Sequence, residues 1–353
     1  MKKTGALLLM MLALIPAAAA AQEVYTLPEI REQAAKGWHE TYTDKYGRTR
    51  QVDIDIEVFG EETAPVVKAG WADPQEYDFG GSSPFTEIKE TRIKRNGVST
   101  YLYDGVVGMK VDLDQKYTED YGNDLTLREV YDFLQELLRE QGVDQEYLWE
   151  QPYTFSILYS AHKDTGEVLV PALYSVMLWQ TEFGLPILTH VGDSFKSGTD
   201  TPVIIPKVRF SMSNRHLYLG GGTAFDVKEI LAEDIPLCSV DKVIEGARKM
   251  IEDGYIKKVY DLRFGYVIYS DPDEAWGKWR TAYDLDTWYL APSWVMYCRI
   301  LEDPKVDQLP EYPRLWEVTI NAQTGEMMDY FDTSLYKGGD ARYKGFISWD
   351  DVK

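Results

Sequence analysis

The chain has 353 residues, of which 44% are hydrophobic and 13% aromatic, so it can bury a sizeable core and is not a disordered or low-complexity chain. Acidic residues outnumber basic ones by 58 to 37, and the formal net charge at pH 7 is −21. A surface this negative repels phosphate backbones and anionic lipids, which argues against nucleic-acid partners and polybasic membrane attachment.

The first 21 residues follow the pattern of a signal peptide. Two lysines precede an apolar run over residues 7–15, and alanines in the A-x-A arrangement predict cleavage near Ala21. The run is short for a bilayer-spanning helix, no later stretch is long and apolar enough to be one, and no cysteine lies near the cleavage site to take a lipid. We expect a secreted, extracellular protein with no transmembrane segment in its mature chain. The alternative is that this segment forms a buried N-terminal helix.

Residues 22–120 favour strands. Gln51–Phe59 alternates polar and apolar residues, which is typical of a half-buried strand. Asn96-Gly97 separates two strand-like stretches and predicts a hairpin turn. Residues 70–84 are rich in glycine, proline, aspartate and serine and predict a loop. We therefore expect a β-rich N-terminal segment.

Residues 121–236 begin with a helix. Thr126 and Glu129 have the capping-box spacing, apolar residues follow at steps of three and four, and Gly142 ends the pattern. Strands are predicted after it at 153–160, 172–179, 203–211 and 216–219, and the glycines at 220–222 predict a flexible turn.

Residues 237–353 repeat this order. A helix starting at Ser239 or Asp241 ends before Gly254, and strands are predicted at 259–269, 293–300 and 316–320. The stretches VPALYSVM at 170–177 and APSWVMYC at 291–298 lie at similar distances behind the two helices. The predicted fold class is therefore α+β, with tandem duplicated helix-plus-antiparallel-sheet lobes at 121–236 and 237–353 behind the β-rich segment.

Two cysteines, Cys238 and Cys298, leave two interpretations open. An even number in an exported chain allows one disulfide. Cys298 lies in an apolar, strand-like run, however, and free buried cysteines often act as small hydrophobic residues.

The sequence contains no pattern that identifies a catalytic or metal site. The four histidines are far apart, H-E-x-x-H is absent, and the acidic clusters lack the order of a calcium loop. We expect no catalytic residues, no metal and no cofactor, and hence a non-enzymatic protein. Spatially paired carboxylates could still make the protein a hydrolase.

An aromatic stretch supplies the candidate binding residues. If exposed on a loop, these rings would suit a protein interface or a platform for stacking sugars. The alternative is that they cover the end of a sheet as part of the core. The residues are Trp276, Trp279, Tyr283, Trp288 and Tyr289.

The segment Trp316–Tyr330, WEVTINAQTGEMMDY, alternates over a strand and then turns at Gln323-Thr324-Gly325. It resembles the closing hairpin of PepSY-type modules. The preceding order of helix and strands resembles the exported regulatory proteins YycH and YycI, and is similar to an uncharacterised family of two-lobed exported Firmicutes proteins, often lipoproteins. The missing lipid-attachment cysteine departs from that pattern. The resemblance implies no catalytic residues and a role in inhibitory or regulatory protein contacts outside the membrane.

Together these observations predict an exported, non-enzymatic protein that acts through protein–protein interaction or regulation at the bacterial cell envelope. A glycan-binding protein that uses residues 276–289 is the alternative, and a hydrolase is a third.

Overall fold

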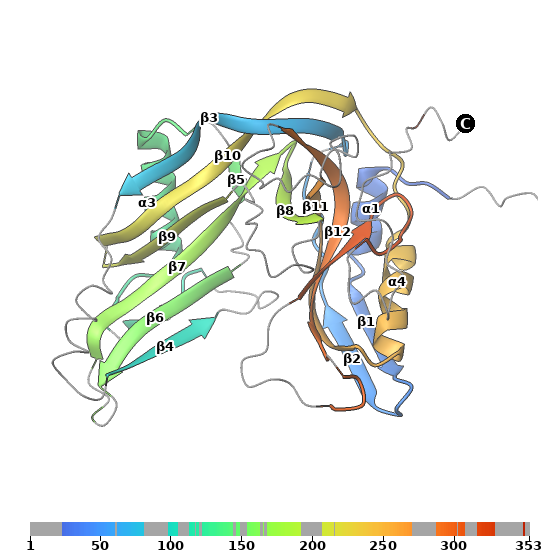
Figure 1. Ribbon diagram of the computed structural model, residues 1–353, viewed down its shortest axis with the longest axis horizontal. Coiled ribbons are helices and arrows are strands. Elements are labelled where there is room, and N and C mark those ends of the chain that lie inside the picture. Colours follow the sequence, from blue (N-terminus) through green and yellow to red (C-terminus); the bar gives the residue numbers. More distant parts are fainter. Residues whose placement is uncertain are drawn as a thin grey trace, which may run out of the picture.

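The computed structural model (Figure 1) describes these residues: 23–60, 62–80, 98–104, 113–116, 118–119, 122–143, 146–148, 154–162, 165, 168–191, 207–214, 216–269, 287–301, 303–307, 316–328 and 349. The predicted signal peptide and the predicted Asn96-Gly97 turn lie outside them.

Three helices are present in this part of the chain: α1 (Leu27–Ala34), α3 (Leu127–Glu140) and α4 (Val240–Glu252). The strands are β1 (Trp38–Thr43), β2 (Thr49–Ile54), β3 (Val66–Gly80), β4 (Val98–Asp104), β5 (Glu146–Leu148), β6 (Thr154–His162), β7 (Val168–Glu182), β8 (Leu185–Val191), β9 (Lys207–Ser213), β10 (His216–Ala232), β11 (Ile256–Tyr269), β12 (Thr287–Ile300) and β13 (Trp316–Asn321).

The helix starts follow from capping side chains. Thr126 and Glu129 form the predicted capping box at α3, and Ser239 accepts a hydrogen bond from the Lys242 N–H at the start of α4. Both predicted helices are thereby confirmed. Helix α1 was not predicted, although Thr26 and Glu29 form the same box in front of it.

The strands form one continuous sheet beside a small two-stranded one. β1 pairs with β2, while eleven strands share a sheet whose main order is β4-β6-β7-β8-β11-β12-β3-β10-β9. β9 also pairs with β7, so the strand order β7-β8-β11-β12-β3-β10-β9 closes on itself. The sheet therefore curls into a nearly closed, barrel-like ring.

This topology shows that the predicted fold class is wrong. The protein is mostly β, and it does not consist of tandem helix-plus-sheet lobes. β3, from the predicted N-terminal segment, pairs with both β10 and β12, so strands from all three predicted segments share one sheet. The physical reason is long-range strand pairing: β3, β7 and β10 have 15, 15 and 17 residues, and each pairs with strands from more than one part of the chain (Figure 1).

Two local predictions fail for a related reason. Residues 70–80 belong to β3 rather than to a loop, and the glycines at 220–222 lie inside β10 rather than in a flexible turn. The two stretches pair with each other through a series of register shifts, with Gly220 opposite Gly80. Pairing partners therefore override the local preference of these residues for turns.

The buried side chains form two hydrophobic clusters. The larger one joins α1 and α4 to strands of both sheets, and includes Trp38, Phe264 and Trp294. In the smaller one, the apolar stripe of α3 packs on β7 and β9, with Tyr131 among the strand residues Tyr174 and Phe210. Figure 1 shows α3 at one end of the molecule and α1 with α4 at the other.

A glutamine side chain closes the ring just before β9 begins. β9 pairs with β7 only as far as Trp179 and with β10 only as far as Gly222. Just beyond, the buried amide of Gln180 donates to the Phe225 carbonyl at 2.6 Å and accepts from the Phe225 N–H at 2.8 Å. The Gln180 amide thus takes the place of a peptide group between β7 and β10.

The predicted closing turn after β13 is confirmed. The Asn321 side chain accepts hydrogen bonds from the N–H groups of Gln323 and Thr324 at 2.8 and 3.1 Å. Gly325 has a φ of +72°, which only glycine adopts easily. The turn supports α4, because the Cys238 N–H donates to the Ala322 carbonyl at 2.8 Å.

Candidate interaction surface

The predicted aromatic binding residues do not form an exposed group in the described structure. Trp288 is 4% exposed; its ring stacks on Phe225 with centroids 4.8 Å apart and meets Trp71 edge-on at 5.0 Å. Trp288 is therefore a core residue, as the alternative interpretation of these rings expects, and its burial weighs against a binding role. Tyr289 is partly buried against the larger cluster. The remaining three, Trp276, Trp279 and Tyr283, lie outside the described residues.

Neither cysteine forms a disulfide, so the disulfide alternative is not realised. Cys298 is buried in β12 between its neighbours on β11 and β13. Burial raises the pKa of Cys238 to about 11, so this thiol is neutral at physiological pH. Both residues act as small hydrophobic side chains in the larger cluster.

No group of three or more histidine, cysteine, aspartate or glutamate residues that could hold a metal ion occurs in the described part of the chain. In the same part, no helix is both long and apolar enough to cross a membrane.

An extensive polar network lies at the tip of the β1–β2 hairpin. Asp44 follows β1 and its side chain is fully buried. One carboxylate oxygen accepts the N–H groups of Tyr46 and Arg48, both at 2.9 Å; the other accepts Arg48 Nε at 2.6 Å and lies 3.2 Å from Arg50 Nη2. The backbone turns at Gly47, whose φ is +79°. An aspartate that accepts from the N–H two residues on is the usual organiser of such a turn.

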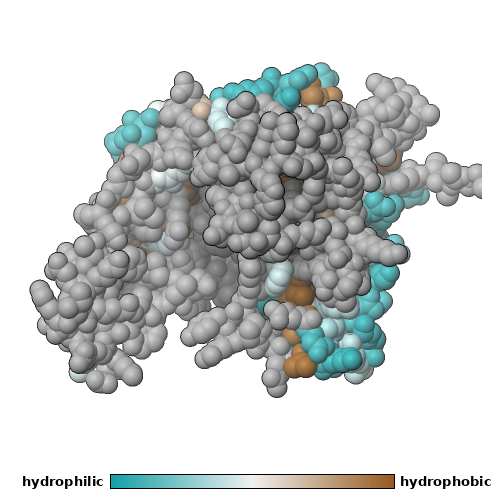
Figure 2. Space-filling model, in the orientation of Figure 1, coloured by the Kyte–Doolittle hydropathy of each residue, from teal (hydrophilic) through white to brown (hydrophobic). Residues whose placement is uncertain are grey.

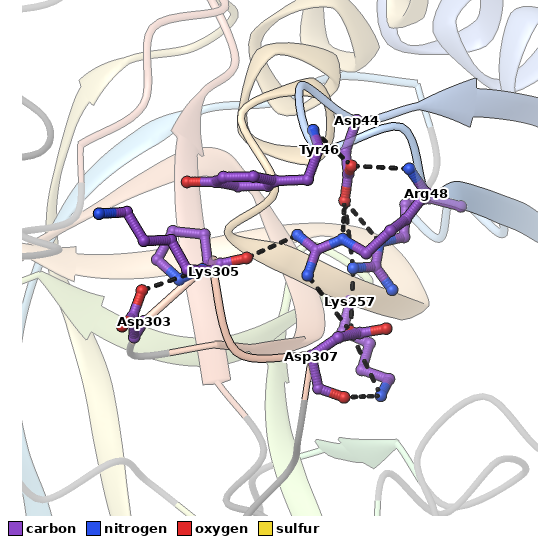
Figure 3. A network of polar contacts seen from close by, with 9 residues as sticks. Asp44, Tyr46, Arg48, Lys257, Asp303, Lys305 and Asp307 are labelled. Atoms are coloured by element: carbon purple, nitrogen blue, oxygen red, sulfur yellow. Dashed lines mark hydrogen bonds and ion pairs between the residues drawn. The ribbon is translucent and has the colours of Figure 1, made fainter.

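A second carboxylate ties this tip to distant parts of the chain. Asp307 lies 3.0 Å from Arg50 Nη2 and 3.4 Å from Lys257 Nζ, and the Pro304 carbonyl accepts from Arg48 Nη2 at 2.6 Å (Figure 3). The hairpin, the start of β11 and the loop 303–307 behind β12 are therefore held in one geometry by charged contacts.

Both carboxylates are stabilised in their ionised form. Burial raises the pKa of Asp44, but hydrogen bonds from Arg48 and from the Tyr46 N–H lower it more, so that it lies below its usual value. For Asp307, too, the effect of burial is outweighed by Arg50 and Lys257, and the pKa is lowered. A general acid needs the opposite shift, so these groups support a structural role.

A further network ties β1 to helix α4. Trp38 Nε1 donates to the Tyr42 hydroxyl at 2.8 Å, and Tyr42 in turn donates to Glu40. Arg248 of α4 lies 3.1 Å from Glu40 Oε2, with its guanidinium 5.7 Å from the centre of the Tyr42 ring. The hairpin is thus fixed along β1 as well as at its tip.

Exposed apolar side chains accompany the tip network. Tyr46 is 40% and Val306 48% exposed, and they are two of the four exposed large hydrophobic residues in the described structure. Lys45 Nζ lies 5.4 Å from the Tyr46 ring centre and 5.2 Å from that of Tyr255, and the Arg48 guanidinium lies 4.7 Å from the Tyr46 ring. We define the hairpin-tip surface as Lys45, Tyr46, Arg48, Tyr255, Lys305 and Val306.

The arrangement of this surface suits binding. In Figure 3 the Tyr46 hydroxyl and the Lys305 ammonium extend to the same side, away from Asp44. Figure 2 shows hydrophobic patches between hydrophilic ones at the lower right, the end at which the β1–β2 hairpin lies in Figure 1. Tyrosine and arginine on a rigid support are typical of binding hot spots. No sequence pattern identifies this surface as a binding site, although the run TDKYGRTR carries a clear turn signal.

Comparison with known proteins adds little. No protein-family model matches the chain, and no curated protein matches it. Among solved structures, an uncharacterized protein from Eubacterium rectale is similar at 11% identity and a TM-score of 0.49, over 86% of this chain and 98% of that one. A likeness this weak carries no argument about function, and the resemblance to PepSY-type and YycH-like proteins stays a prediction.

Proposed function

We propose that this protein is an exported, non-enzymatic protein that binds another protein at the bacterial cell envelope, with the hairpin-tip surface as the contact. The observation that carries the proposal is the exposed Tyr46 ring, bracketed by Lys45 and Arg48 above the buried Asp44 carboxylate.

The proposal is supported by the order of these side chains before a partner binds. A tyrosine has few rotatable bonds, and the contacts of Arg48 with Asp44 and with the Pro304 carbonyl order the guanidinium beside the ring before any partner arrives. Less conformational freedom is then lost on binding, so more of the contact energy appears as affinity. The glycan alternative is weakened because one of its rings, Trp288, is buried.

A photo-cross-linking experiment tests the proposal. The cross-linking amino acid p-benzoylphenylalanine is placed at Val306 in the producing bacterium, and at Ile230 as control, because Ile230 is exposed to 49% on β10. We expect a discrete adduct with one protein from position 306 only, lost when Tyr46→Ala is added. Adducts that form equally at both positions, or that persist with Tyr46→Ala, would contradict the proposal.

Export is tested separately. We expect the protein in the culture medium to begin at Gln22, as N-terminal sequencing would show. A protein retained inside the cell with residues 1–21 intact would disprove this part.

A further inference from the structure

The end of the molecule around the hairpin-tip surface has a charge unlike the rest of the chain. Acidic residues exceed basic ones by 58 to 37 overall, but among the described residues at this end the basic ones are the more numerous. The described basic residues here are Lys45, Arg48, Arg50, Lys257, Lys258, Arg299 and Lys305, and the acidic ones are Asp44, Glu252, Asp253, Asp303 and Asp307.

Two of these five carboxylates, Asp44 and Asp307, differ from the exposed lysines in their contacts. The Asp44 side chain is fully buried, and Asp307 lies against Arg50 and Lys257, so both carboxylates neutralise the supporting network. Lys45, by contrast, is 45% exposed, lies between two tyrosine rings and is 3.9 Å from its nearest carboxylate, Asp253.

A second lysine, on β11, also lies over a tyrosine ring. Lys258 Nζ lies 4.6 Å from the centre of the Tyr260 ring, at a point where the β11–β12 register shifts. A ring attracts a cation through its quadrupole but does not cancel the charge. The surface therefore presents positive charge together with aromatic and aliphatic area.

From this we infer that the segment bound at the hairpin-tip surface is an acidic stretch of polypeptide that also carries an aromatic or aliphatic side chain. This inference rests on the function proposed above and names the chemistry of its partner. Carboxylates would meet Lys45 and Lys305, and the apolar side chain would pack on Tyr46 and Val306.

A short acidic segment fits better than a long polyanion. A nucleic acid or an anionic polysaccharide chain that reached this surface would run on over the acidic remainder of the molecule and be repelled. A polypeptide segment can place a few carboxylates locally and avoid that repulsion.

The test uses the mature full-length chain and a fluorescently labelled random copolymer of glutamate and tyrosine, with binding followed by anisotropy at low ionic strength. We expect Lys45→Glu with Lys305→Glu to weaken binding at least about tenfold, because each reversal replaces an attraction by a repulsion. Lys36→Glu with Lys228→Glu changes the net charge equally at exposed sites elsewhere and should change the affinity less than about twofold. Circular dichroism checks that both variants are folded.

Three further results complete the test. Binding should weaken with added salt and with Tyr46→Ala, and polyglutamate should bind less well than the copolymer. Equal weakening by the two double variants, or tighter binding of heparin at this surface, would overturn the inference. If Lys45→Glu with Lys305→Glu leaves the Val306 adduct unchanged, the acidic partner is refuted while the proposed protein contact stands.

Discussion

Replacement of Asp44 tests whether the buried carboxylate organises the hairpin tip. Asp44→Ala leaves the N–H groups of Tyr46 and Arg48 without their acceptor and removes one of the two carboxylates beside Arg50, whose side chain is only 7% exposed. Breaking a buried charged contact of this kind costs about 3–5 kcal/mol. Asp44→Asn keeps an oxygen for the two N–H groups but loses the charge, and should cost about 1.5–3 kcal/mol.

Urea unfolding followed by tryptophan fluorescence measures both losses, since Trp38 lies on the same hairpin. Asp53→Asn is the matched control: Asp53 lies on β2, its side chain is 66% exposed, and it contacts the exposed His39. Its loss should stay below about 0.5 kcal/mol. Equal small effects for Asp44→Asn, Asp44→Ala and Asp53→Asn would refute the reasoning.

The Asp44→Asn variant also tests how the stability of the fold depends on pH. Because the folded protein lowers the pKa of Asp44, this carboxylate stabilises the fold fully above its unfolded pKa of about 4, and the stabilisation is lost as the pH falls through the lower folded value. The stability difference between wild type and Asp44→Asn should therefore be constant near neutral pH and shrink below about pH 4. A difference that grows on acidification would contradict this.

Three other predictions concern the rest of the fold. Gln180→Ala should leave both backbone groups of Phe225 without a partner, cost about 2–3 kcal/mol and speed hydrogen exchange of the Phe225 amide, whereas unchanged exchange would exclude the bridging role. Cys238 and Cys298 should stay unreactive toward a thiol reagent in the native protein and react only after unfolding; fast reaction or a bond between them would disagree. Phe183 has a φ of +51° in the β7–β8 turn, so Phe183→Asn should raise the melting temperature by a few degrees, and a decrease would mean that the exposed ring contributes stability.

Features set by neighbouring residues could be predicted from the sequence. The start of α3 depends on Thr126 and Glu129, and the closing turn depends on Asn321 and Gly325, all within a few residues of the hydrogen bonds that they form. For the same reason α1 could have been found from its own capping box, but the β-rich composition around it concealed that signal.

Features that depend on distant partners could not be predicted from the sequence. Residues 70–80 look like a loop, and only pairing with the glycines of β10 makes them a strand. An aromatic residue such as Trp288 fits a core or a surface equally well until Phe225 and Trp71 are known to surround it. The hairpin-tip network joins Arg48 to Pro304 across more than 250 residues, and no local pattern reveals that contact.

The placement of β3 also dictates the order in which the fold can be completed. β3 lies near the beginning of the chain, yet its partners are β10 and the first part of β12, where Gly70 pairs with Thr287. A chain that emerges N-terminus first, from a ribosome or through a translocation channel, thus exposes β3 without a partner until most of its length has appeared. Loop closure over such a distance is slow, and the ring forms late. The ring can therefore close only after β12 has emerged, and a chain that stops before β12 leaves β3 with an open edge, prone to pair with other chains.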